Sequence, residues 1–212
     1  MEDARELLKS ERRVKWVFTG DSITHGVVYT FGARDYVQLF EERVRCELAR
    51  VLDVVIKTAI SGWTVPQILD DIDANILQFK PDAVSIMLGM NDADRVSFAD
   101  FAQGYRKILD ILKENGDPAV LLHTPNPIIP GLDKKRDENL PAIVEEIRRI
   151  GAERGIQVID HWAEWKNLGR LYPWMGDTIH PNTQGHVAFA RRMFKDLGIW
   201  DEESAVCRSF VY

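Results

Sequence analysis

The chain has 212 residues, which is enough for one α/β domain with a full hydrophobic core and too few for two such domains. Hydrophobic residues make up 45% and charged residues 28%, as in an ordinary globular protein, and no apolar run approaches the ~20 residues of a membrane span. The net charge of −6 and the pI near 5.4 exclude a basic stripe that would neutralise a phosphate backbone, so neither nucleic acid nor membrane is an expected partner.

Five short β-rich segments alternate with helical patterns along the chain. The expected strands read mostly as continuous apolar runs, which is typical of parallel strands buried on both faces, and they span residues 14–19, 54–60, 83–88, 119–124 and 156–159. The expected helices carry apolar residues at three- and four-residue spacing, and they span residues 35–50, 65–79, 98–114, 138–154 and 181–197.

This alternation predicts a three-layer α/β/α sandwich around a five-stranded parallel sheet. The chain shows no repeat, low-complexity segment or linker, so we expect residues 1–212 to form a single domain. In such folds ligands bind beyond the carboxyl ends of the strands. The segments that follow the strands are therefore where a site is expected.

Ser22 follows the first expected strand, in the segment T-G-D-S-I-T-H-G over residues 19–26. A serine between glycines at a strand-to-loop turn can present its hydroxyl at the top of the sheet. It becomes a good nucleophile only when a base accepts its proton. Taken alone, the segment favours a simpler interpretation, in which Ser22 or Asp21 caps the next helix.

A base and an orienting carboxylate stand together near the other end of the chain, in Asp177-Thr178-Ile179-His180-Pro181. An Asp three residues before a His can reach the imidazole Nδ1 within one turn, which fixes the tautomer and leaves Nε2 free to face a serine. The alternative is that His180 is a helix-entry residue bonded to the backbone. Pro181 suits the first turn of the helix that follows.

Two further strand ends offer hydrogen-bond donors. Gly62 follows the second expected strand and has an unhindered N–H, while Asn91 follows the third and has a side-chain amide. Both kinds of donor can stabilise a developing oxyanion. Each is weak evidence alone, because glycine and asparagine are common in loops after strands.

Together, these four segments resemble the SGNH hydrolases, also called the GDSL esterase/lipase family. The segment G-D-S-I-T at 20–24 is similar to the first block of that family, and Gly62 to the glycine of its second. G-M-N-D at 89–92 and D-T-I-H-P at 177–181 are similar to its third and last blocks. The order and spacing agree over nearly the whole chain.

The resemblance implies a flavodoxin-like sheet with strand order 2-1-3-4-5 and no metal or organic cofactor. It implies Ser22 as the nucleophile, His180 as the general base and then acid, and Asp177 as the orienting carboxylate. It also implies an oxyanion hole formed by the backbone N–H groups of Ser22 and Gly62 and the side chain of Asn91.

Residues that flank these segments are candidates for contact with a substrate, namely Asp21, His25, Trp63, Met90 and Trp174. For Asp21, hydrogen bonding to the neighbouring backbone to shape the turn is the favoured alternative, and core packing is an even alternative for the two tryptophans. His161 also lies near the expected mouth of the site, whereas His123 and His186 are expected to be structural. We expect Asp92 and Asp94 to brace the Asn91 loop, and residues 125–135 to wall a substrate pocket or to act as a rigid connector.

The predicted function is hydrolysis of a carboxylic ester through an acyl-enzyme, with release of a short acyl (acetyl) group from a carbohydrate or other small metabolite. A thioesterase or lysophospholipase that uses the same site is the nearest alternative. A non-catalytic carbohydrate-binding module that keeps the fold is a second. A nucleotide or flavin binder has little support, because the chain has neither G-x-G-x-x-G nor G-x-x-x-x-G-K-[ST].

Other features of the sequence concern the cellular location of the protein and metal binding. Cys46 and Cys207 do not form a disulfide framework, and the N-terminus has no apolar signal segment, so a cytoplasmic location is expected. No zinc-type spacing of His and Cys occurs, and the segment at 71–75 lacks the glycine of a calcium loop. The sequence does not indicate an oligomeric state.

Overall fold

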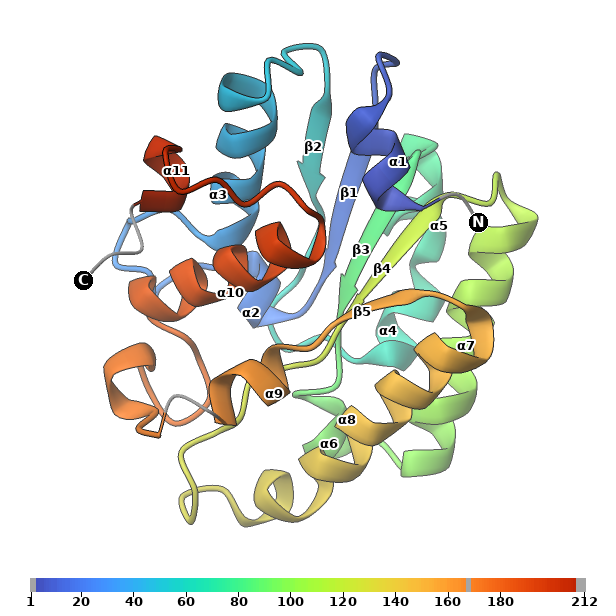
Figure 1. Cartoon of the computed structure of the whole chain (residues 1–212). Coiled ribbons are helices and arrows are strands. Elements are labelled where there is room, and N and C mark those ends of the chain that lie inside the picture. The colour runs from blue at the N-terminus through green and yellow to red at the C-terminus, as the bar shows by residue number, and fades with distance from the viewer. Residues whose placement is uncertain (1–2, 167–168, 209–212) are drawn as a thin grey trace.

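The computed structural model describes residues 3–166 and 169–208, so the two ends of the predicted domain, 1–2 and 209–212, lie outside the described residues. A five-stranded parallel sheet forms the centre, in the order β2-β1-β3-β4-β5 (Figure 1). This confirms the predicted strand order. The strands are β1 Lys15–Gly20, β2 Val54–Lys57, β3 Ala83–Met87, β4 Ala119–His123 and β5 Gln157–Ile159.

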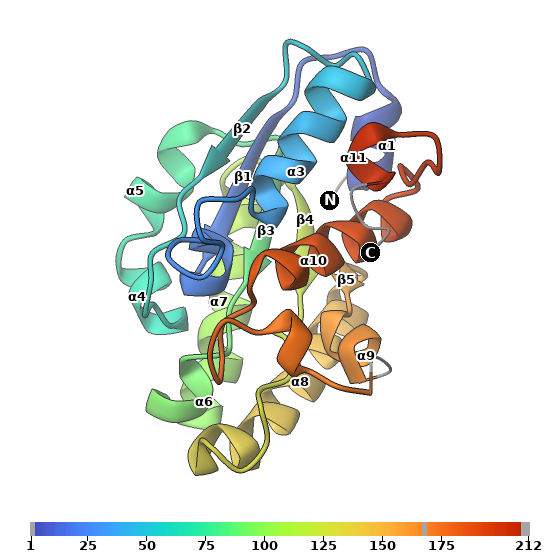
Figure 2. The ribbon, with the colours of Figure 1, turned by 90° about the vertical axis from the view of Figure 1, so that its left-hand side faces the viewer.

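Helices cover both faces of this sheet, which makes the predicted three layers (Figures 1 and 2). Helices α3 and α10 pack together on one face, while α4, α7 and α8 lie on the other. The longer helices are α3 Tyr36–Glu42, which continues as a π-helical turn over Arg43–Glu47, α4 Val65–Asp70, α7 Phe98–Glu114, α8 Lys134–Arg154 and α10 Thr183–Asp196. The short ones are α1 Ala4–Lys9, α2 Ser22–His25, α5 Ile72–Asn75, η2 Leu77–Phe79, α6 Asp92–Arg95, α9 His161–Lys166, η3 Tyr172–Trp174 and α11 Ala205–Arg208.

The central strands are apolar on both faces because both faces are covered. Every residue of β3 and β4 is buried. On the α3 face, Phe18 of β1 packs against Tyr36 and Phe40, with ring centroids 6.1 Å and 5.0 Å apart. Burial of such aromatic side chains is a large part of the hydrophobic driving force for folding.

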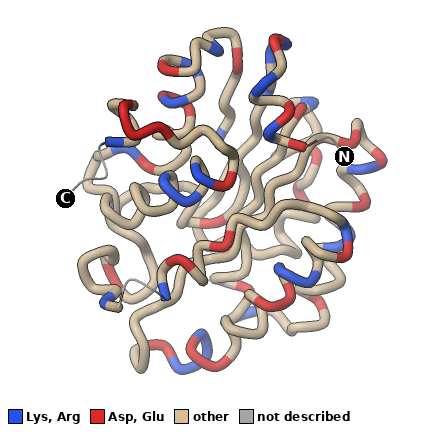
Figure 3. The backbone as a smooth tube through the Cα atoms, viewed as in Figure 1, with Lys and Arg blue, Asp and Glu red and all other residues tan. Residues whose placement is uncertain are grey.

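Most charged side chains lie on the outside of these layers. Figure 3 shows Lys and Arg interspersed with Asp and Glu over the helices and outer loops. The strands carry only two charged residues, Lys15 and Lys57, each at a strand end. No helix among residues 3–166 and 169–208 is long and apolar enough to cross a membrane.

The prediction of one continuous helix over residues 65–79 is wrong. The chain forms α4, α5 and the 3-10 turn η2 instead. The Asn75 side chain donates to the Asp71 carbonyl at 3.2 Å and to its carboxylate at 2.9 Å, and Asp71 itself has φ −123°. Short polar side chains of this kind compete with the backbone for hydrogen bonds and interrupt helices.

Two other helix boundaries differ from the expected ones. Helix α8 begins at Lys134 rather than at 138, because the Asp133 carboxylate caps it by accepting from the Arg136 N–H. Helix α10 begins at Thr183 rather than at 181, because the Asn182 side chain accepts from the N–H groups of Gln184 and Gly185. Both caps satisfy N–H groups that the first helical turn leaves without intrahelical partners.

Candidate active site

Ser22 begins the short helix α2 directly after β1, at the carboxyl edge of the sheet. The Asp21 carboxylate caps this helix by accepting from the Ile23 N–H at 2.9 Å. Gly20 allows the turn, because a Cβ at this position would lie 2.2 Å from the Met87 carbonyl oxygen of β3. The close approach of β1 and β3 therefore fixes where the serine emerges.

His180 and Asp177 approach Ser22 from the loop between η3 and α10. The His180 Nε2 lies 2.9 Å from the Ser22 Oγ, and its Nδ1 lies 2.9 Å from an Asp177 carboxylate oxygen. We refer to Ser22, His180 and Asp177 as the triad. Such a chain of hydrogen bonds can move a proton from a serine to an imidazole while the carboxylate orients the ring.

The Asp177 carboxylate is held in its charged form by its own loop. Burial acts to raise the pKa of Asp177, but hydrogen bonds from the His180 backbone and ring and from the Ile179 N–H outweigh it and lower that pKa. The backbone bonds measure 2.6 Å from His180 and 2.8 Å from Ile179. An ionised carboxylate is what a histidine base requires beside Nδ1.

Gly62 and Asn91 lie on the two loops next to the triad. Gly62 has φ +84°, a conformation that favours glycine, and a Cβ there would meet only the Arg95 guanidinium within 4 Å. The Asn91 Nδ2 donates one of its two N–H groups to the Trp63 carbonyl at 3.1 Å. That bond orients the amide, and the second N–H of the amide has no hydrogen-bond acceptor among the described residues.

A pocket of about 410 Å³ joins these groups, and we refer to it as the triad pocket. It is lined by Ser22, Val27, Val28, Tyr29, Ser61, Gly62, Met90, Asn91, Arg95, Arg136, Ile179 and His180. Four segments that are distant in sequence thus meet at the carboxyl edge of the sheet, as the topology predicts.

The sequence as a whole agrees with this arrangement. A model of the GDSL-like lipase/acylhydrolase family matches residues 18–188, which include all four segments. The chain belongs to this family. It is therefore an esterase of the GDSL, or SGNH, type, and the resemblance in the sequence is confirmed.

Individual relatives are similar to this chain at low sequence identity. An acetylxylan esterase from Geobacillus stearothermophilus is 26% identical over 161 residues, which cover 68% of this chain and 72% of that protein. The crystal structure of an acetylxylan esterase from the same organism has a TM-score of 0.75 at 25% identity, and the match covers 87% of this chain and 94% of that one. An uncharacterized protein from Mycoplasma pneumoniae is 32% identical over 123 residues, which cover 58% of this chain but only 13% of that relative.

Tyr29 is a residue of this esterase's site that the sequence analysis missed. Its ring stacks on the His180 imidazole at 4.2 Å between centroids with an interplanar angle of 6°. Interaction of its hydroxyl with the Asp177 carboxylate raises the pKa of Tyr29. Nothing in the local sequence signals this role, because Tyr29 lies in an irregular loop whose path depends on tertiary contacts.

Asp92 braces the two loops that carry Gly62 and Asn91. Its carboxylate accepts from the Val65 N–H at 2.8 Å and from the Gly89 N–H at 3.1 Å. Burial raises the pKa of Asp92 to about 6. Asp94 contributes differently, through ion pairs with Arg95, Lys135 and Arg136 at 3.5–3.8 Å.

The candidate substrate-binding residues differ in how far they are buried and in whether they line the triad pocket. Met90 lines the triad pocket, and His25 is partly exposed, with its Nδ1 3.0 Å from the Ser61 Oγ. Trp63 and Trp174 are half-buried against the core and do not line this pocket. Asp21 is fully buried, so its expected contact with a substrate is not available in this structure.

The buried histidines form a separate group beneath the site. His161 is fully buried, which corrects the expectation that it lies at the mouth. Its Nε2 lies 2.9 Å from the His123 Nδ1, and the His123 Nε2 lies 2.8 Å from the Ser85 Oγ. Burial lowers the pKa of His123 to about 3 and that of His186 to about 4, and it also lowers the pKa of His161.

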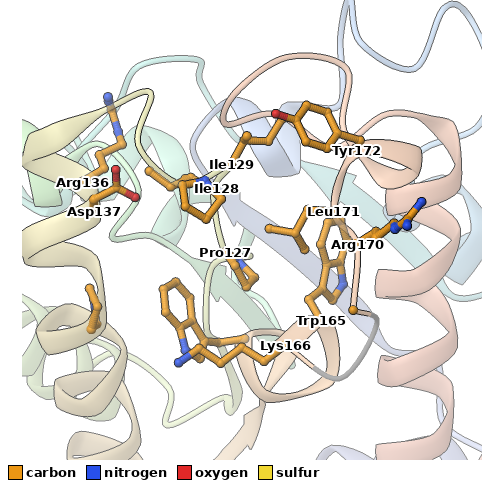
Figure 4. Close-up of a pocket in the computed structure, with 14 residues that line it drawn as sticks. Pro127, Ile128, Ile129, Arg136, Asp137, Trp165, Lys166, Arg170, Leu171 and Tyr172 are labelled. Atoms are coloured by element: carbon orange, nitrogen blue, oxygen red, sulfur yellow. The ribbon is translucent and has the colours of Figure 1, made fainter.

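A second, larger cavity of about 490 Å³ lies beside the triad pocket (Figure 4). Pro127 and Ile128 of the loop after β4 face Leu171 and Trp165 across it. Arg136 borders both cavities, but no triad residue lines the larger one. The loop expected at 125–135 thus walls this apolar cavity rather than the triad pocket.

Proposed function

We propose that this family member is a serine-dependent carboxylic-ester hydrolase that removes short acyl groups, acetyl above all, from a carbohydrate or other small metabolite. The observation that carries the proposal is the hydrogen-bonded triad, with the Ser22 Oγ 2.9 Å from the His180 Nε2 and the opposite nitrogen 2.9 Å from Asp177. The acetylxylan esterase relatives support acetylated carbohydrate as the substrate class.

The reaction begins when the Ser22 Oγ attacks the ester carbonyl carbon and its proton passes to the His180 Nε2. The carbonyl oxygen becomes an oxyanion, which accepts hydrogen bonds from the N–H groups of Ser22 and Gly62 and from the Asn91 amide. Collapse of this intermediate breaks the bond to the alcohol oxygen, which takes the proton from His180. An acetyl-serine remains.

Hydrolysis of the acetyl-serine repeats these steps with water. His180 accepts a proton from the water as its oxygen attacks the acyl carbon, and the same three donors hold the second oxyanion. The bond to the Ser22 Oγ then breaks, and Ser22 recovers its proton from His180. The products are the alcohol and acetic acid, and no cofactor is consumed.

The test compares the wild type with Ser22→Ala on p-nitrophenyl acetate, together with acetate release from a panel of acetylated sugars. Loss of turnover in the variant would support the serine mechanism, and the ranking of the panel would identify the sugar class. Equal turnover by both proteins would overturn the proposal in favour of a binding module. Circular dichroism of the variant controls for folding.

Acyl preference separates the neighbouring activities. Because the related proteins are acetylxylan esterases, we expect acetyl esters to be favoured over octanoyl esters. Rates on acetyl, butyryl and octanoyl esters, and on matched thioesters, measure this preference. A higher kcat/KM for octanoyl esters or for the thioesters would instead support a lysophospholipase or a thioesterase.

A further inference from the structure

The charged side chains that line the triad pocket are unusual for this acidic chain. The whole sequence has 33 Asp and Glu against 27 Lys and Arg. Yet among the described residues that line the pocket, the two permanently charged side chains are both arginines, Arg95 and Arg136, and no carboxylate lines it. The pocket is also lined by the apolar residues Val27, Val28 and Ile179.

Arg95 lies next to the reacting groups. It ends α6, the helix that starts directly after Asn91, and its Nη1 donates to the Gly62 carbonyl at 3.0 Å. The same nitrogen lies 3.7 Å from the position that a Cβ on Gly62 would occupy. A substrate held against Gly62 would therefore meet this guanidinium within a few ångströms of its ester.

Arg95 also keeps donors for a ligand. A guanidinium has five N–H groups, and the side chain of Arg95 is 53% exposed. The bond to Gly62 uses one of these groups, and the pairing with Asp94 is a loose one at 3.7 Å. The planar fork of a guanidinium matches a carboxylate with two parallel hydrogen bonds.

Arg136 differs from Arg95, because its side chain is only 8% exposed and its guanidinium is engaged by other groups of the protein. Its Nε donates to the Met90 carbonyl at 2.9 Å, and its Nη1 pairs with Asp133. Asp94 is shared among Arg95, Lys135 and Arg136. Asp94 thus pairs with three cations at once and does not engage Arg95 alone, so Arg95, the exposed arginine of the pocket, is the one that a bound anion would meet.

We propose that Arg95 binds a carboxylate of the substrate, so that the preferred substrates are acetyl esters with a carboxylate near the ester, as in an acetylated sugar acid. This inference rests on the proposed function of the triad. Arg95 is a specificity-determining residue in it and takes no part in bond making or breaking. The carboxylate binds the guanidinium while the acetyl carbonyl lies between Ser22 and Gly62.

The experiment measures kcat/KM for two esters of the same shape, 3-acetoxybenzoate and 3-acetoxybenzamide, and for O-acetyl glucuronic acid against O-acetyl glucose. The readout is the ratio of anionic to neutral substrate in each pair. We expect the wild type to favour the anionic member about tenfold or more, because charge-assisted bidentate bonds are the strong ones. This ratio should fall as salt is raised, since the side chain is exposed.

Variants test the assignment to Arg95. Arg95→Gln should bring the ratio close to one, and Arg95→Lys should restore part of it. Lys135→Gln is the matched control, because it removes one positive charge from the same cluster at a residue that does not line the pocket, and it should keep the wild-type ratio. A wild-type ratio near one, or an unchanged ratio in Arg95→Gln, would overturn the inference.

The failure of the inference is distinguishable from the failure of the proposed function. Hydrolysis of both esters at equal kcat/KM, dependent on Ser22, would leave the function standing and remove the carboxylate site. If neither ester is hydrolysed, the carboxylate site is tested by binding instead. Isothermal titration calorimetry of the wild type with 3-acetamidobenzoate and 3-acetamidobenzamide should then show tighter binding of the anion. This preference should be lost in Arg95→Gln. Equal affinity for the two amides would contradict the carboxylate site.

Discussion

Hydrogen bonds and a ring contact from neighbouring residues orient the proposed reacting groups. The Asn91 amide is aimed by its bond to the Trp63 carbonyl, and the His180 ring is held by Asp177 on its edge and Tyr29 on its face. Oriented donors stabilise a transition state because they need little reorganisation as charge develops. The kinetic effects of individual side chains follow from this arrangement.

Asn91→Ala removes one of the three proposed oxyanion donors. The loss of such a donor costs roughly 3–4 kcal/mol of barrier, so we expect kcat on p-nitrophenyl acetate to fall by a factor on the order of hundreds, with a smaller effect on KM. Steady-state kinetics on the purified variant measures this. A rate near that of the wild type would remove Asn91 from the mechanism.

Tyr29→Ala removes both the ring that stacks on His180 and the hydroxyl that interacts with Asp177. We expect kcat to fall about tenfold, because loss of orientation at a catalytic group lowers the rate without removing the group itself. Tyr29→Phe keeps the stacking and should lose less. A comparison of kcat for the two variants measures the share of the ring, and equal losses would assign the effect to the hydroxyl.

Gly176 offers an independent check on the same contact. A Cβ at this position would lie 2.9–3.0 Å from the Tyr29 ring and Cβ, so Gly176→Ala would displace the tyrosine from His180. If stacking is what matters, Gly176→Ala should lower kcat in the same direction as Tyr29→Ala. An unaffected kcat would show that the histidine does not depend on this ring.

At the level of elements, the loops after β2 and β3 act as one unit because Asp92 ties them together. The carboxylate accepts one backbone N–H from the start of α4, at Val65, and another from the turn after β3, at Gly89. Gly62 and Asn91 stand on these two loops. Their separation is therefore set by a fully buried side chain that does not line the triad pocket.

Asp92→Ala should leave the two N–H groups without their acceptor in a buried place. We expect the free energy of unfolding to fall by about 2–6 kcal/mol, since each of the two unsatisfied buried N–H groups costs about 1–3 kcal/mol. Urea denaturation followed by tryptophan fluorescence measures this loss. Asp92→Asn keeps one acceptor oxygen and should fall between the wild type and the alanine variant, and a loss below 1 kcal/mol for alanine would contradict the bracing role.

Helices and strands were predictable from the sequence where local residue patterns determine them. Strands β1, β3 and β4 were readable because burial on both faces leaves continuous apolar runs, and α7 coincides with its expected range of 98–114. The break at Asp71 was not readable, because the apolar spacing over 65–79 continues through it while side-chain bonds interrupt the backbone. Tyr29 and Arg95 were missed because their positions depend on loop paths and not on periodicity.

At the scale of the whole molecule, burial shifts the pKa of a carboxyl group and of imidazole groups in opposite directions. Burial raises the pKa of Asp21 to about 7 from 3.8, whereas it lowers the pKa of His123 to about 3 and that of His186 to about 4 from 6.5. Asp21 therefore contributes stability at low pH that is lost as the pH rises through about 7. The histidines contribute stability above pH 6.5 that is lost as the pH falls toward 4 and 3.

Asp21→Asn separates these opposing contributions. The Asn side-chain oxygen can keep the cap on the Ile23 N–H, and in the described part of the chain the Asp21 Oδ2 that it replaces accepts no hydrogen bond. Because the carboxyl of the wild type must ionise in a buried place as the pH rises, the variant should gain stability relative to the wild type by about 2–3 kcal/mol between pH 5 and pH 8. Urea unfolding of both proteins at pH 5, 6.5 and 8 measures this gain.

His186→Gln serves as the opposite control, because it should lose its disadvantage in stability relative to the wild type as the pH falls from 7 to 4. A stability difference between Asp21→Asn and the wild type that does not change with pH would show that Asp21 titrates alike in the folded and unfolded chains.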